Sequence, residues 1–151
     1  MRIRLVTTVL APFKEVYTGF NRKLFEYLMP PFGLAKIERY QGQEPGDIVD
    51  LKFRVPFVGS WTVIIKEKWL SYREYGFIDR GLRVPFGIVY WKHIHRVVAR
   101  DKNTSFIVDD IEYETEWKVL DYLLYYPLLL IFWPRKFSYK KFFEKGDNNS
   151  P

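Results

Sequence analysis

The chain has 151 residues, which is enough for one domain with a well-buried core, and aromatic residues make up 19% of it. It contains no cysteine, so disulfides and thiolate metal sites are excluded. The net charge is +6, partly from basic residues near the C-terminal end. No nucleic-acid-binding motif accompanies this charge, so no nucleic-acid partner is expected.

The N-terminal segment predicts a strand followed by two short helices. Residues Arg2 to Leu10 alternate as in a strand. Pro12 then stands where a helix can begin, and apolar residues recur at helical spacing as far as Pro30, with Gly19 interrupting them. Two threonines break the first apolar run and no small-residue cleavage site follows. We therefore do not interpret this segment as a signal peptide, and we expect a cytoplasmic location.

The middle of the chain predicts six further strands, separated by short turns rich in Gly, Pro, Asn and Asp. The short spacers imply antiparallel neighbours, because parallel strands need long crossover connections. The strands are expected at 35–42, 47–55, 61–69, 73–80, 88–100 and 104–115.

From Trp117 to about Lys145 the apolar residues recur at helical spacing, and Pro127 and Pro134 should kink or divide this helix. Its apolar run, YLLYYPLLLIFW at 122–133, is shorter than the roughly 20 residues that span a bilayer. The predicted fold class is α+β, with a single domain over 1–145 and a disordered polar tail at 146–151. About seven strands form a curved antiparallel sheet that wraps around the long C-terminal helix.

Strand alternation assigns the two histidines of the chain to the interior. In YWKHIHR (90–96), Lys92 and Arg96 share one face of the strand, which must be exposed to solvent. His93 and His95 therefore point to the other face. A turn centred on Lys102 sets His95 opposite Asp109, His93 near Ile111 and Trp91 near Tyr113. Alternation also assigns an inward face to Val49, Leu51, Phe53 and Val55, and to Trp61, Val63, Ile65, Glu67 and Trp69.

Three stretches together resemble the START-like, or Bet v 1-like, superfamily, and specifically its SRPBCC or polyketide cyclase/dehydrase members. They are IIKEKWLSYREYGFID (64–79), YWKHIHRVV (90–98) and TSFIVDDIEY (104–113). The resemblance runs over about residues 2 to 145. It implies a helix-grip fold, with a hydrophobic cavity between the sheet and the last helix. It also implies a lipid, sterol, polyketide or similar apolar ligand, and in a minority of members an enzymatic activity.

The main hypothesis is that the protein binds a small hydrophobic ligand in this cavity, as a carrier or sensor, without a cofactor. Glu67, His93, His95 and Asp109 would orient one end of the ligand. The expected walls are Leu51, Phe53, Trp61, Val63, Ile65, Trp91, Ile111 and Tyr113, with Leu124 and Leu128 from the helix.

Three alternatives use the same residues or their surroundings. His95 could act as a general acid or base, oriented by Asp109 and assisted by Glu67, in a cyclase or dehydratase reaction. Two histidines and a carboxylate could also bind a metal, although such histidines more often form hydrogen bonds in a pocket wall, and no metal is expected. Residues 122–141, apolar and then basic, could dock on an anionic membrane surface. A homodimer is possible, but nothing in the sequence specifies it.

Overall fold

The computed structural model describes residues 1–56 and 58–144, and the expected tail at 146–151 lies outside this range. Seven strands form one antiparallel sheet in the order β1-β7-β6-β5-β4-β3-β2. They are β1 (Arg2–Val9), β2 (Ala35–Tyr40), β3 (Ile48–Phe53), β4 (Ser60–Leu70), β5 (Glu74–Arg83), β6 (Ile88–Ala99) and β7 (Ser105–Thr115). The α+β helix-grip prediction is confirmed, and every strand lies within three residues of its predicted bounds.

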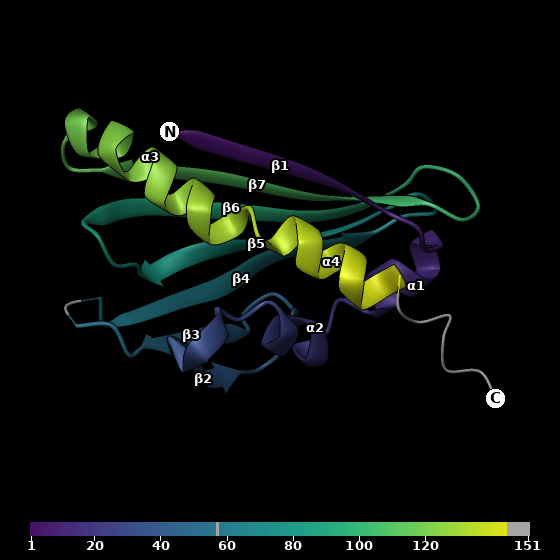
Figure 1. Ribbon diagram of the computed structural model, residues 1–151, viewed down its shortest axis with the longest axis horizontal. Coiled ribbons are helices and arrows are strands. Elements are labelled where there is room, and N and C mark those ends of the chain that lie inside the picture. Colours follow the sequence, from purple (N-terminus) through teal and green to yellow (C-terminus); the bar gives the residue numbers. More distant parts are fainter. Residues whose placement is uncertain (57, 145–151) are drawn as a thin grey trace.

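The helices lie on one face of this sheet (Figure 1). They are α1 (Phe13–Thr18), α2 (Arg22–Tyr27), α3 (Lys118–Phe132) and α4 (Arg135–Glu144), with a 3-10 turn at Pro31–Gly33. The long helix is divided at Pro134, as predicted, whereas Pro127 is accommodated inside α3. Within the described residues, no helix is both long enough and apolar enough to cross a bilayer.

A buried carboxylate fixes the start of α3 against the sheet. Asp121, in the first turn, accepts hydrogen bonds from the Thr115 backbone N–H at 2.7 Å and from the Thr115 hydroxyl at 2.8 Å. The Tyr113 hydroxyl donates to the Asp121 carbonyl at 2.6 Å. Because these groups join the end of β7 to the helix, they set the direction in which α3 leaves the sheet.

The core consists of two apolar clusters with a polar band between them. One cluster, which includes Phe77, Val97 and Ile107, packs around Tyr139 of α4. The other gathers around Leu128 and Phe132 of α3 and includes Ile3, Trp61, Ile88, Trp91, Ile111 and Tyr113. The polar band lies between the clusters, because Phe77 of the first packs on His95 and Phe132 of the second packs on His93. The break between α3 and α4 lies over the middle strands of the sheet (Figure 1).

Candidate functional site

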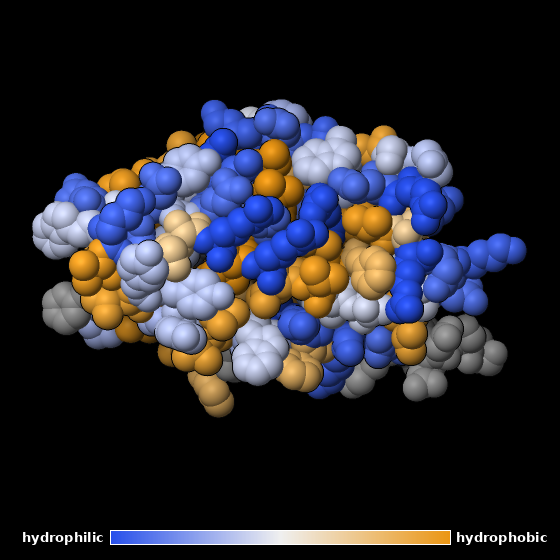
Figure 2. Space-filling view, turned by 90° about the horizontal axis from the view of Figure 1, so that it is seen from above, coloured by the Kyte–Doolittle hydropathy of each residue, from blue (hydrophilic) through white to orange (hydrophobic). Residues whose placement is uncertain are grey.

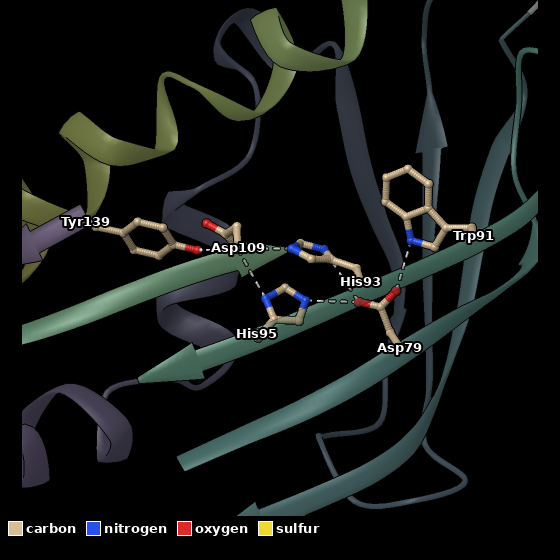
Figure 3. Close-up of polar contacts among 6 residues, drawn as sticks. All are labelled: Asp79, Trp91, His93, His95, Asp109 and Tyr139. Atoms are coloured by element: carbon tan, nitrogen blue, oxygen red, sulfur yellow. Dashed lines mark hydrogen bonds and ion pairs between the residues drawn. The ribbon is translucent and has the colours of Figure 1, made fainter. Parts of the chain in front are cut away.

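Four titratable side chains from three adjacent strands form the polar band (Figure 3). Asp79 on β5 is paired with His93 on β6, and His95 on β6 is paired with Asp109 on β7. The register of β6 and β7 is the predicted one, with His95 opposite Asp109. Asp79, His93 and Asp109 are each less than 7% exposed.

Each imidazole lies between both carboxylates. His93 Nε2 is 3.1 Å from Asp109 Oδ1, and its Nδ1 is 3.7 Å from Asp79 Oδ2. His95 is arranged in the opposite sense, with Nε2 2.9 Å from Asp79 Oδ2 and Nδ1 3.5 Å from Asp109 Oδ1. The two ring centroids are 3.7 Å apart. The four side chains thus form a closed set, with two imidazoles bridging two carboxylates.

Two further donors hold the carboxylates from outside. The Trp91 indole N–H donates to Asp79 Oδ1 at 3.1 Å. The Tyr139 hydroxyl, from α4, donates to Asp109 Oδ1 at 3.3 Å. Both carboxylates are therefore oriented by neighbours on the sheet and the helix as well as by the histidines (Figure 3).

Aromatic rings pack against the histidines on both sides. Phe77 stacks on His95 with ring centroids 4.3 Å apart. Phe132, at the end of α3, meets His93 edge to face at 5.4 Å. Since rotation of either imidazole would open gaps in this packing, both rings are fixed in position.

The two histidines differ in proton affinity. Burial and the charge of His95 together lower the pKa of His93, outweighing its hydrogen bond with Asp109. Burial also disfavours the charged form of His95, but its hydrogen bonds with Asp109 and Asp79 and their charges outweigh burial and raise the pKa. The pair therefore favours a proton on His95 and a neutral His93.

The same contacts determine the state of Asp109 and Tyr139. Burial alone would raise the pKa of Asp109, but the hydrogen bonds with His93 and His95 outweigh it and hold the pKa well below its usual range. Burial and the charge of Asp109 raise the pKa of Tyr139 well above its usual value. Asp109 is thus ionised, and Tyr139 keeps the proton that it donates.

A cavity of about 110 Å³, partly open to solvent, adjoins this cluster. Its polar corner contains Asp79, His93 and His95, whereas Asp109 lies behind the histidines and does not line it. Of the predicted ligand-binding residues, the cavity is lined by Leu51, Phe53, Trp61, Val63, Ile65, Trp91, His93 and His95, together with Val49. Their role in binding stays a prediction.

The remaining predicted wall residues lie elsewhere. Ile111, Tyr113 and Leu128 are fully buried in the cluster around α3, and Leu124 packs against that cluster. They do not line the cavity, because α3 lies directly over this end of β7 and fills the space there.

The prediction that Glu67 faces inward is wrong, because a bulge in β4 reverses the alternation. Ile65 pairs with Asp79, but Glu67 pairs with Ile78, so Lys66 is an extra residue in the ladder. From this point the side chains change faces, and Glu67 is exposed. Trp69, also predicted to face inward, packs instead over Gly76 on the outer face. Val55, another predicted interior residue, is 40% exposed because β3 ends at Phe53.

Sequence reasoning missed the polar side chains of Asp79, Tyr139 and Arg135. Asp79 was available from the alternation of Tyr75, Phe77 and Asp79 along β5, which all face inward. Tyr139 and Arg135 come from α4, and no single apolar stripe of the predicted C-terminal helix indicated which of its side chains face the sheet. The cavity also includes Phe25, Met29, Tyr40, Gln43, Phe77, Ile131 and Phe132.

No protein-family model and no curated protein matches the chain. Solved structures do. Norcoclaurine synthase from Thalictrum flavum, in complex with dopamine and hydroxybenzaldehyde, has a TM-score of 0.69 at 17% identity, over 99% of this chain and 89% of that one. The Zhui aromatase/cyclase from Streptomyces sp. R1128 has a TM-score of 0.73 at 15% identity, over 96% and 94%. A protein from Nitrosospira multiformis has a TM-score of 0.70 at 12% identity, over 95% and 96%. The chain therefore adopts the START-like, or Bet v 1-like, helix-grip fold.

Proposed function

We propose that the protein binds a small, largely apolar molecule with one polar group in the cavity between the sheet and the helices, as a carrier or sensor. The observation that carries this proposal is the contrast within the cavity wall. Aromatic and aliphatic side chains form most of the wall, and Asp79, His93 and His95 form one polar corner. Such a composition is typical of small-molecule sites, in which a few polar groups orient an otherwise apolar guest.

The volume of the cavity limits the size of the molecule that can bind there. A closed cavity on the order of 150 Å³ holds one benzene ring, so a volume of about 110 Å³ suits a guest of about one ring. The structure of norcoclaurine synthase holds dopamine and hydroxybenzaldehyde. Aromatic molecules of this size, with a hydroxyl or carbonyl group for the polar corner, are therefore the first probes to use.

Calorimetric titration with hydroxybenzaldehyde tests the binding, with the protein treated beforehand with a chelator. Saturable one-to-one binding is expected for the unsubstituted protein. Val63→Trp should abolish binding, because Val63 lines the cavity and the larger ring would fill it. The matched control is Val89→Trp, at a position that is 62% exposed on β6 and outside the cavity. Binding that survives Val63→Trp would place the guest elsewhere.

A second candidate is acid–base catalysis at the same corner, favoured by the position of His95. Its ring lines the cavity and lies between two carboxylates that can hold it during proton transfer. A guest carbonyl at this corner would be set for enolisation, dehydration or aldol-type ring closure.

The test follows exchange of the protons next to the carbonyl of a bound ketone in heavy water. His95→Gln should abolish the exchange while Glu67→Gln, at an exposed site, retains it. Equal exchange in both variants would exclude this role.

A third candidate is docking on a membrane to deliver or collect the guest. It rests on the outer face of α3 and of the first turn of α4. Large apolar side chains are exposed along it: Trp117, Val119, Tyr122, Leu123, Tyr126, Leu130, Trp133 and Phe137. Orange and pale side chains mix over α3 at the lower left of Figure 2. Between Trp117 and Phe143 the one acidic residue, Asp121, is buried, whereas Lys118, Lys140 and Lys141 are exposed. This combination suits docking on an anionic membrane surface.

Co-sedimentation with vesicles tests the docking. We expect binding to vesicles that contain phosphatidylserine, reduced by high salt and by the double substitution Leu123→Glu and Leu130→Glu. Leu70→Glu, at an exposed position on β4, is the control and should bind normally. Failure to sediment, combined with self-association in solution, would assign this face to a homodimer instead.

A further inference from the structure

We propose that Asp79, His93 and His95 form a binding site for a divalent transition-metal ion such as Zn²⁺. The inference is independent of the proposed guest, since it concerns the polar corner alone. Two imidazole nitrogens and one carboxylate oxygen are a ligand set that first-row transition metals accept. The donor atoms of these three residues all lie within 4.8 Å of one another.

The spacing of the donor atoms fits a metal. His95 Nε2 and His93 Nδ1 both face Asp79 Oδ2, at 2.9 and 3.7 Å. Bonds of about 2.0–2.1 Å place the ligands of a tetrahedral zinc site about 3.3 Å apart. Changes of a few tenths of an ångström in these two distances would therefore bring both nitrogens to that spacing from Asp79 Oδ2.

The second polar atom of each ligand is already occupied by the protein. Asp79 Oδ1 accepts the indole N–H of Trp91, which leaves Oδ2 for the ion. His93 Nε2 and His95 Nδ1, the nitrogens that face away from Asp79, are 3.1 and 3.5 Å from Asp109 Oδ1. Metal-binding histidines characteristically donate their other N–H to a carboxylate. Asp109 would thus be a positioning residue for both imidazoles.

Charge and placement support the same assignment. A metal binds neutral imidazoles, so its binding would displace the proton from His95. The two carboxylates and two neutral imidazoles of the cluster would then carry a formal charge of −2 in a buried site, which a divalent ion would balance. The ligands stand on the two adjacent strands β5 and β6, in the interior of the sheet, and both strands hold them rigidly. All three line the cavity. A fourth coordination position would therefore open toward the cavity, where water or a polar group of a guest could occupy it.

Titration of chelator-treated, guest-free protein with Co²⁺ or Zn²⁺ tests the site. We expect one ion per chain by calorimetry and a visible Co²⁺ spectrum of a four- or five-coordinate site. Asp79→Asn should remove measurable binding, and Asp109→Asn should weaken it about 10- to 100-fold. Glu67→Gln, at an exposed carboxylate, should bind as the unsubstituted protein does.

A readout without substitutions guards against variants that do not fold. Because the chain has only two histidines, Co²⁺ should shift the NMR signals of both imidazoles strongly, while each keeps one N–H bonded to Asp109. Absence of stoichiometric binding, or Co²⁺ bound without effect on both imidazoles, would overturn the proposal and leave a network held by hydrogen bonds alone. The guest titration uses metal-free protein, so failure of one proposal leaves the other intact.

Discussion

At the scale of single residues, the site is a charged network placed inside an apolar core. Taking carboxylates out of water is costly unless each polar atom has a partner. Here, within the described part of the chain, every buried side-chain nitrogen and oxygen has a hydrogen-bond partner. Asp109 connects the histidines of the sheet with α4, since His93, His95 and Tyr139 all lie around it. Its loss should therefore affect the whole network.

Asp109→Ala is expected to lower the free energy of unfolding by about 3–5 kcal/mol, because it leaves buried partners unpaired. Urea denaturation followed by tryptophan fluorescence measures the change. Glu38→Ala, which removes an exposed ion pair with Lys36, is the control and should change the free energy by less than about 1 kcal/mol. A loss at Asp109 no larger than this control would contradict the account of the network.

A second carboxylate, on the outer face, predicts a pH dependence. Arg2 donates to Asp110 at 2.8 and 2.6 Å, and this pairing lowers the pKa of Asp110 below 3.8 despite its burial. The folded state therefore holds the proton less tightly than the unfolded state. The resulting stabilisation is fully present above about pH 3.8 and is lost as the pH falls through the lowered pKa.

Asp110→Asn should accordingly be less stable than the unsubstituted protein at pH 6, with the difference shrinking below pH 3.8. Thermal melts across this range measure it. A stability gap that stays constant into strong acid would show that Asp110 acts through packing rather than through its charge.

At the scale of elements, the sequence predicted what regular periodicity determines. Alternation gave the strands and placed His93 and His95 inside, and the turn at Lys102 gave the register of β6 with β7. The rule of alternation failed at Lys66, where β4 has a bulge. A bulge depends on the hydrogen bonds between β4 and β5, and no residue type in that stretch requires a bulge. The contact from Tyr139 could not be predicted, since it depends on how α4 lies over the sheet.

Because of the bulge, Trp69 packs over Gly76 on the outer face of the sheet, and this contact can be tested. A Cβ atom added at Gly76 would lie 2.2 Å from the Trp69 ring, so Gly76→Ala should destabilise the protein by about 1–3 kcal/mol. In a Trp69→Ala background the same substitution should cost much less, because the ring is gone. A double-mutant cycle by urea denaturation measures this coupling. Independent effects would mean that Trp69 does not pack over Gly76.

At the scale of the whole molecule, the break between α3 and α4 connects the fold with the proposed function. Phe132, before the break, packs on His93, and Tyr139, after it, reaches Asp109. Ile131 and Arg135, on either side, line the cavity. The helices thus cover the polar band, while a small volume beside it stays free. A guest in that volume would contact the sheet, the helices and the polar corner together.

Binding at the polar corner is tested by NMR of the protein with labelled histidine and tryptophan side chains, titrated with hydroxybenzaldehyde. Among two histidines and five tryptophans, His93, His95, Trp61 and Trp91 line the cavity. We predict saturable shifts at these four and none at Trp69, Trp117 or Trp133, which lie outside it. Shifts confined to the outer tryptophans, or none at the histidines, would contradict the proposed binding at the polar corner.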